Sequence, residues 1–319
     1  MKKKVAIVFT AFVAVTVFLT GCQREDQPWP SRAIQVVIPF SPGGDTDINA
    51  RQYIMHLGQV LGVPVVGQNI IGQAGAVGAT HVMNAAPDGY TVLIYQTTMF
   101  LNRAAGVSTL NLDQFEVVAI AAQGDFAVVV QAESPFHTLQ DLIDASVAAP
   151  EGLIFAMNIG ATSQLTGVLL NQAGADMRLV DVGDGAQRVT SLMGGHIHAI
   201  PTAFGPVMPH LEAGAFRALA IVNTERNIVL TEVPTTVELG FPDAVIPIFY
   251  FFLFPRGTPN HIVDGFADAL QQVHNMEAYQ RGIVETFQQT PFFLRGEAAA
   301  QALRAQEAWA YTFRDALRE

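Results

Sequence analysis

Short apolar runs alternate with longer stretches of helical periodicity along most of the chain. A short apolar run that ends in turn residues is typical of a buried strand, whereas apolar residues three or four positions apart indicate an amphipathic helix. The runs predict strands at residues 34–40, 63–66, 90–95, 117–121, 126–130, 153–156, 177–182, 196–200, 215–222 and 246–254. The periodicity predicts helices at residues 46–61, 76–86, 139–149, 163–173, 186–193, 234–240, 260–274 and 297–317. This alternation predicts an α/β fold with parallel sheets and helices on both faces.

The first 22 residues have a different pattern. Three lysines at positions 2–4 precede an uncharged, largely apolar run over residues 5–19, and Leu19-Thr20-Gly21-Cys22 follows. A basic start, a short apolar region and a small-residue site predict a secretory signal peptide. Its end resembles the lipobox of bacterial lipoproteins, so we expect acylation of Cys22; the alternative is an ordinary signal or a short anchor helix. Residues 23–30 are polar with two prolines and read as a tether.

The charge of the predicted mature chain is strongly acidic. All lysines lie in the signal, which leaves 14 arginines against 28 acids and a formal charge of −14. Such a chain gives little support to nucleic-acid binding. Cys22 is the only cysteine, so an internal disulfide is excluded.

Four glycine-rich turns lie between a predicted strand and a predicted helix: the first turn (residues 39–47), the second (72–78), the third (158–163) and the fourth (183–185). Glycines let a ligand approach the backbone, and a helix N-terminus offers free N–H groups to an anion. A tight turn with a helix cap is the simpler alternative for each. None matches a Walker loop or a dinucleotide fingerprint. Because parallel strands end at one edge of a sheet, four such turns favour a ligand site there.

Signatures of catalysis are weak. The sequence has no G-x-S-x-G elbow, and the anchor accounts for the only cysteine. His196 and His198 lie two apart on a predicted strand, but without a third ligand nearby a structural role is favoured over a metal site. The aromatic clusters at Phe249–Phe254 and Phe292–Phe293 are interpreted as core. We therefore expect neither an enzyme nor a cofactor.

Several motifs together resemble the extracytoplasmic substrate-binding proteins of tripartite tricarboxylate transporters, the Bug-type receptors. The matching segments span essentially the whole predicted mature chain: Trp29–Ser31, Ile38–Asp47, Asn69–Gly78, Ala86–Thr91, Gly194–Gly195, Pro209–Gly214, Arg217–Ala220, Val233–Thr235 and Pro255–Pro259. The resemblance implies a two-lobed, flytrap-like periplasmic-binding-protein fold with the ligand in the cleft between the lobes. One lobe would contain residues 31–103 and 228–319, and the other residues 104–227.

The resemblance also implies the binding residues. The first lobe would hold a carboxylate, and the second a distal group of the ligand. Carried over by position, the site comprises Ser41, Gly43, Gly44, Asp45, Thr46, Asp47, Gly75, Ala76, Val77, Gly78, Thr97, Gly160, Thr162, Ser163, Gly185, Thr202 and Ala203.

The chain departs from the family pattern at several of these positions. Asp45 and Ala74 replace usual glycines, Ala161 and Gln164 stand where serine and histidine are frequent, and Thr202-Ala203 replaces a frequent Asp-Asn pair. A carboxylate at position 45 would repel a second acid group or receive an amino group or a hydroxyl. We therefore expect a carboxylate-bearing ligand, without assigning it as citrate.

The resulting expectation is a monomeric, membrane-anchored receptor outside the cytoplasm. It would capture a small organic carboxylate and deliver it to integral-membrane transporter subunits. A sensor for a membrane signalling partner, or a secreted enzyme using the same cleft, are the alternatives.

Overall fold

The computed structural model describes residues 28–319. The predicted signal, Cys22 and most of the predicted tether lie outside the described residues. No helix within residues 28–319 combines the length and apolar character that a bilayer span requires.

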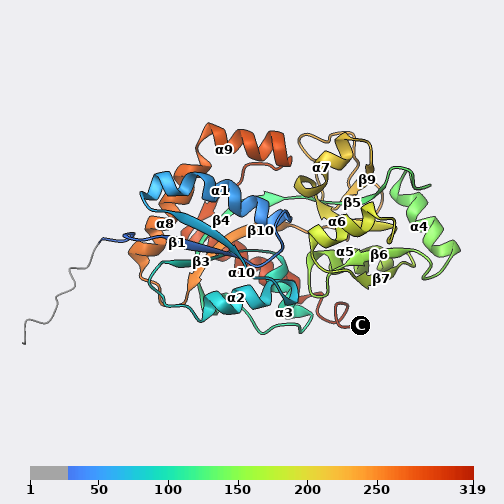
Figure 1. Ribbon diagram of the computed structural model, residues 1–319. Helices are drawn as coiled ribbons and strands as arrows, with labels where there is room; N and C mark the ends of the chain where they lie inside the picture. The colour runs from blue at the N-terminus through green and yellow to red at the C-terminus, as the bar shows by residue number, and fades with distance from the viewer. Residues whose placement is uncertain (1–27) are drawn as a thin grey trace, which may run out of the picture.

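A six-stranded sheet forms the larger half of the molecule (Figure 1). Its order is β11 (Leu294–Arg295), β4 (Phe115–Gly124), β10 (Ile248–Pro255), β3 (Thr91–Gln96), β1 (Ile34–Ile38) and β2 (Val65–Asn69). β1 pairs in parallel with β2 and β3, whereas β10 runs antiparallel to both β3 and β4. The sheet is therefore mixed rather than parallel, because β10 enters it from the opposite end.

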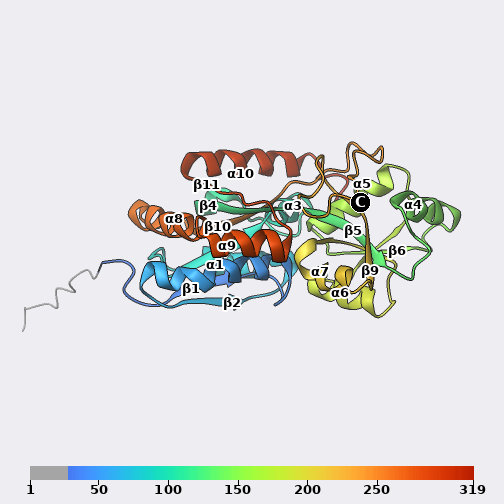
Figure 2. The same cartoon turned by 90° about the horizontal axis from the view of Figure 1, so that it is seen from above.

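Helices cover both faces of this sheet, as the alternation predicts. Val36 and Ile38 of β1 pack towards α1 (Asp45–Leu61), α8 (Asn260–His274) and α9 (Glu277–Arg281). Val37 packs on the other side, with α2 (Ala76–Met83), α3 (Thr98–Ala104) and α10 (Gly296–Tyr311). Figure 2 shows α10 and α1 on opposite sides of the strands. Successive strand residues face opposite sides, so continuous apolar runs suit a sheet that is buried on both.

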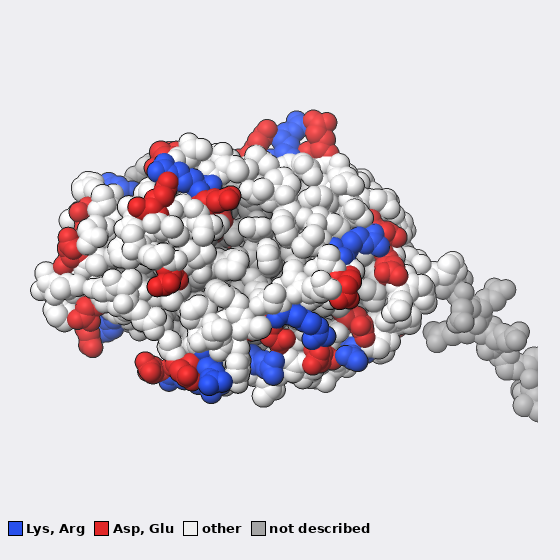
Figure 3. Space-filling view, turned by 180° about the vertical axis from the view of Figure 1, so that it is seen from behind, with Lys and Arg blue, Asp and Glu red and all other residues white. Residues whose placement is uncertain are grey.

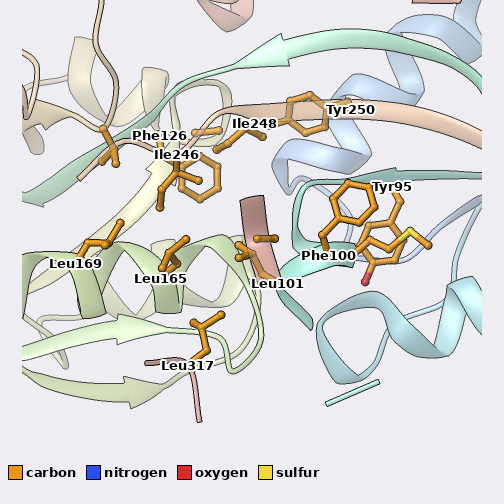
Figure 4. Packing of buried hydrophobic residues seen from close by; sticks show 14 of the residues in the cluster. Tyr95, Phe100, Leu101, Phe126, Leu165, Leu169, Ile246, Ile248, Tyr250 and Leu317 are labelled. Atoms are coloured by element: carbon orange, nitrogen blue, oxygen red, sulfur yellow. The ribbon is translucent and has the colours of Figure 1, made fainter. Parts of the chain in front are cut away.

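A five-stranded sheet forms the other half. Its order is β7 (Arg178–Asp181), β6 (Ile154–Met157), β8 (Ala199–Ala203), β5 (Phe126–Gln131) and β9 (Phe216–Ile221). Hydrophobic residues of α4 (Leu139–Ala148) and α5 (Thr162–Gln172) share one core cluster, and those of α6 (Gly185–Met193) and α7 (Phe204–Glu212) share another. The larger cluster continues into the six-stranded half: Figure 4 shows Leu165 and Leu169 on one side of Leu101, and Phe100 and Tyr95 on the other.

The chain crosses between the sheets at two places. β4 passes directly into β5 at Asp125, and the segment 222–247 returns from β9 to β10. The division expected at residue 103 does not coincide with the change of sheet, because β4 pairs with β10 and β11 in the six-stranded sheet. Near the C-terminus, the carbonyl of Leu317 accepts a hydrogen bond from Gln164 of α5.

Several local predictions need correction. Residues 234–240 form turns rather than a helix, β8 begins at Ala199, and α10 ends at Tyr311. The sequence reading missed α3, α7, α9 and β11, as well as the short helical turns η1 (Gln73–Gly75), η2 (Leu112–Gln114) and η3 (Gly282–Thr286). α7 was not predicted because it contains two prolines. Pro206 lies in the first turn of the helix, where no backbone N–H is needed, and Pro209 lies in the helix interior.

Phe252 tests the packing of β10. Its side chain is fully buried and makes edge-to-face contacts with Tyr53 of α1 and Phe266 of α8. We expect Phe252→Ala to lower the free energy of unfolding by about 3–5 kcal/mol in urea titrations, because no neighbour fills the cavity. The matched control is Met55→Ala, since Met55 lies on α1 with 61% of its surface exposed. It should change stability by less than about 0.5 kcal/mol; equal losses would contradict the assigned packing.

Candidate functional site

Loops from both sheets surround one cavity of about 150 Å³. All four glycine-rich turns, with the residues that flank them, contribute to its wall: Pro39, Phe40, Ile71, Gly72, Gln73, Ala74, Gly75, Asn158, Gly183, Asp184 and Gln187. The expected convergence of the turns is therefore present. The turns that follow β1 and β2 face the turns that follow β6 and β7.

The first turn is held in shape by a buried carboxylate. Asp47 accepts hydrogen bonds from the Gly43 amide (3.0 Å), Arg51 Nε (2.8 Å) and Asn69 Nδ2 (2.8 Å). Asn69 also donates to the carbonyl of Phe40 at 2.8 Å. Burial alone raises the pKa of Asp47, but these hydrogen bonds outweigh it and lower the pKa below its ordinary value of 3.8. Asp47, which the resemblance placed among the ligand contacts, thus uses its carboxylate to fix the turn.

The second turn places consecutive residues in left-handed backbone conformations. Gln73, Ala74 and Gly75 have φ values of 47°, 48° and 96°. Gly75 is required there, because a Cβ atom would lie 2.5 Å from the hydroxyl of Tyr95. That hydroxyl donates to the Ala74 carbonyl (2.6 Å), and Asn102 donates to the Gln73 carbonyl (2.8 Å). The carbonyls of the turn are therefore occupied. The backbone amides of Gln73 and Ala74, in contrast, have no acceptor in the described part of the chain.

The third turn begins α5. The Ser163 hydroxyl accepts the Asn158 amide (2.9 Å), and Gln164 accepts the Gly160 amide (2.7 Å). The amide of Thr162 donates across the boundary between the halves, to the hydroxyl of Thr98 in α3 at 3.3 Å. The third turn is therefore held from both halves.

The fourth turn contains the carboxylate of Asp184, which caps α6. It accepts the Gln187 amide (3.4 Å) and, from the other half, the Ser41 amide (2.9 Å). Behind it, Arg188 donates to the carbonyls of Gly183 (2.8 Å) and Pro201 (3.3 Å). Asp184 and Arg188 are 8% and 4% exposed, so both are buried where the halves meet.

Asp45 completes this group of charges. Tyr250 of β10, itself fully buried, donates to Asp45 Oδ2 at 2.9 Å. Burial raises the pKa of Asp45, although Tyr250 and the charge of Arg188 act against the rise. Burial likewise lowers the pKa of Arg188 to about 10, opposed by Asp45, Asp184 and Asp181. No ion pair joins Arg188 to a carboxylate within the described chain, and its Nε has no partner.

The other residues that the resemblance implied lie around the cavity in different ways. Gly75 lines it directly, and the first residues of α1, α5 and α6 lie at the surrounding turns. The hydroxyl of Thr97 is used in hydrogen bonds at the start of β10. It accepts a hydrogen bond from the Phe249 amide and donates one to the Pro247 carbonyl, each at 3.0 Å. Thr202 and Ala203 are buried at the end of β8.

The sequence reading missed Arg188, Asp184 and Tyr250 as site residues. A signal for Arg188 existed: it lies four residues before Leu192 and beside Val189, on the apolar face of α6. Asp184 stands between the two glycines of the fourth turn. Tyr250 had no such signal, because it shares its strand with four phenylalanines.

The histidine pair has a structural explanation. Both residues precede β8 rather than lying on it, and His198 Nδ1 accepts the Ile154 amide at 2.9 Å. Within residues 28–319 no three His, Cys, Asp or Glu side chains are grouped to hold a metal ion.

Comparisons with known proteins agree on one family. The family model described as "Tripartite tricarboxylate transporter family receptor" matches residues 49–303. Protein BugT of Bordetella pertussis is 32% identical over 268 residues, covering 81% of this chain and 80% of that protein. Among solved structures, MatC from Rhodopseudomonas palustris with bound malate has a TM-score of 0.81 at 26% identity. The periplasmic binding protein BugD has a TM-score of 0.83 at 25% identity. The alignments cover 91% of this chain in both cases, and 100% and 99% of those structures.

The role of Asp47 gives a pH-dependent prediction. Because its pKa is lowered in the folded state, its contribution is present above pH 3.8 and is lost as the pH falls through the lowered value. We expect Asp47→Asn to lower the free energy of unfolding by about 1.5–3 kcal/mol at pH 7. In urea titrations the difference from wild type should shrink below pH 3.8. Asp315→Asn, at an 81% exposed side chain, is the control; a pH-independent difference for Asp47→Asn would contradict the assignment.

Proposed function

This chain belongs to the tripartite tricarboxylate transporter receptor family, and we propose that it captures a small carboxylate-bearing solute and delivers it to a membrane transporter of that type. Members of the family are periplasmic solute-binding receptors rather than enzymes. The observation that carries the proposal is the cavity, whose wall is built by turns from both sheets. A ligand that contacts both halves stabilises the closed form through contacts that an open form cannot make.

The donors for a carboxylate lie in the second turn. Gln73 and Ala74 precede α2 and line the cavity, and their backbone amides have no acceptor in the described part of the chain. Successive backbone N–H groups in such a turn, at the positive end of a helix, bind an anion without a basic side chain. This suits a protein whose charge is strongly negative. On the face shown in Figure 3, blue and red side chains are interspersed and no continuous basic area is visible.

The two crossings are suited to act as the hinge of closure. Asp125, between β4 and β5, accepts hydrogen bonds from Asn223 (2.7 Å) and Asn227 (3.1 Å) of the returning segment. The two segments are thus tied to each other. Rotation about this tie would open and close the cavity while both sheets stay intact.

A lipid on Cys22 would keep the receptor beside its transporter. The described chain begins at the end of the six-stranded half that lies away from the five-stranded half (Figure 1), where Trp29 donates to the Gly89 carbonyl. A tether attached there leaves the cavity and both halves accessible.

Labelling with a radioactive fatty acid tests this anchor, since Cys22→Ala should abolish the label.

Ligand capture is tested by thermal shift against mono- and dicarboxylates, followed by calorimetry. We expect saturable stabilisation of about 2.7 kcal/mol at a ligand concentration 100 times the Kd, without turnover. Chemical conversion of a bound acid would contradict a receptor.

Asn158 tests the location of the site. Asn158 lines the cavity, and its backbone amide donates to Ser163, so truncation of its side chain should remove only the exposed hydrogen bond to Asp181 and leave the turn in place. We expect Asn158→Ala to weaken the affinity for the acid identified in the screen about 5- to 30-fold, through loss of one or two polar contacts. Gln301→Ala, on the exposed face of α10, is the matched control and should bind normally. Normal binding by Asn158→Ala would move the site elsewhere.

A further inference from the structure

The cavity wall contains a single charged side chain, and that side chain is an acid. Asp184 is the carboxylate; the other lining residues are apolar, glycine, or the neutral amides Gln73, Asn158 and Gln187. A ligand that consisted only of anionic groups would therefore meet one charged wall of its own sign.

The carboxylate of Asp184 has no directly paired cation behind this wall. Arg188, the one cation among the groups that act on Asp45, is already engaged with two backbone carbonyls. It forms no ion pair with Asp184 in the described chain. Asp184 is 8% exposed, and a buried carboxylate is most stable when it is paired, so this arrangement favours a cationic group of the ligand near Asp184.

Asp184 retains the capacity to bind such a cation. A carboxylate has about four acceptor positions. Two of them serve the amides of Ser41 and Gln187. An ammonium group of the ligand can take the remaining positions while these hydrogen bonds stay in place.

Hydrogen-bond donors and the acidic acceptor therefore lie on opposite sides of the cavity. Donors without acceptors, the amides of Gln73 and Ala74, belong to the second turn in the six-stranded half. The acceptor, Asp184, belongs to the fourth turn in the five-stranded half. A volume of about 150 Å³ suits a small molecule that carries a carboxylate and an ammonium a few bonds apart.

We propose that the solute is a small amino carboxylate, whose ammonium group is bound by Asp184 and whose carboxylate is bound by the second turn. This inference rests on the proposed function, since it names the chemical class of the captured acid.

The test compares acids that differ only by an amino group. Calorimetry on the purified protein would use the pairs propionate and alanine, butyrate and 2-aminobutyrate, succinate and aspartate, and glutarate and glutamate. We expect at least one amino member to bind more tightly than its partner by about tenfold or more, as for a charge-assisted hydrogen bond.

Variants assign this preference to Asp184. Asp184→Asn keeps the size and one acceptor oxygen, which can serve the Gln187 amide or the Ser41 amide but not both, and it removes the charge. It should weaken binding of the amino acid about 30-fold or more, the effect of removing one member of a buried charge pair, and should weaken binding of the desamino partner much less. Asp184→Ser, which can still cap α6 and carries no charge, is a second variant and should act in the same direction.

Asp176→Asn is the matched control. Asp176 is an exposed acid of the five-stranded half, and it lies outside the cavity wall. An equal loss in Asp176→Asn would overturn the assignment, because it would indicate a general field effect. Desamino acids that bind as tightly as their amino partners would overturn the inference and leave the proposed function standing. Binding of no acid from the panel would overturn both.

Discussion

The pairing of β4 with β10 determines how the two halves are joined. Gly124, the last residue of β4, lies opposite Ile248, the first residue of β10. The five-stranded sheet is inserted between these neighbours, so the chain must leave and return at adjacent positions. The two crossing segments are tied to each other, because Asp125 of the first accepts hydrogen bonds from Asn223 and Asn227 of the second. The closure that we propose for the cavity would depend on this one antiparallel pair.

The groups next to the cavity, rather than the net charge of the whole chain, determine the electrostatic character of the cavity. The chain is strongly acidic, yet the cavity wall has no basic side chain. Asp184 and Arg188 are buried behind the turns, and Asp45 lies beside them. Hydrogen bonds to Tyr250, Ser41 and two carbonyls hold these three side chains in place. Held charges discriminate between ligands because a wrong partner leaves them unpaired.

Much of the fold could be predicted because local pattern and burial agree. The strands of both sheets are apolar runs with turn residues at their ends, and α1, α5 and α8 show helical periodicity and lie close to their expected bounds. Elements that depend on neighbours were missed: α3 follows β3 without a break, α7 contains two prolines, and β11 is a two-residue strand formed only by pairing with β4. The prediction of parallel sheets was wrong in part. The direction of β10 depends on the end at which the returning chain enters the sheet, and the composition of the strand does not encode it.

The sequence by itself determined the α/β class, the family, and the four turns at which strands give way to helices, because glycine placement and apolar periodicity act over a few residues. Only the tertiary structure decided what those turns do. It assigned Asp47 to holding the first turn, placed Asp184 against Ser41 from the other half, and buried Arg188 behind them. Asp184 and Ser41 are 143 residues apart. No local pattern encodes such a contact, since it exists only when the two sheets meet and exclude water from the charges between them.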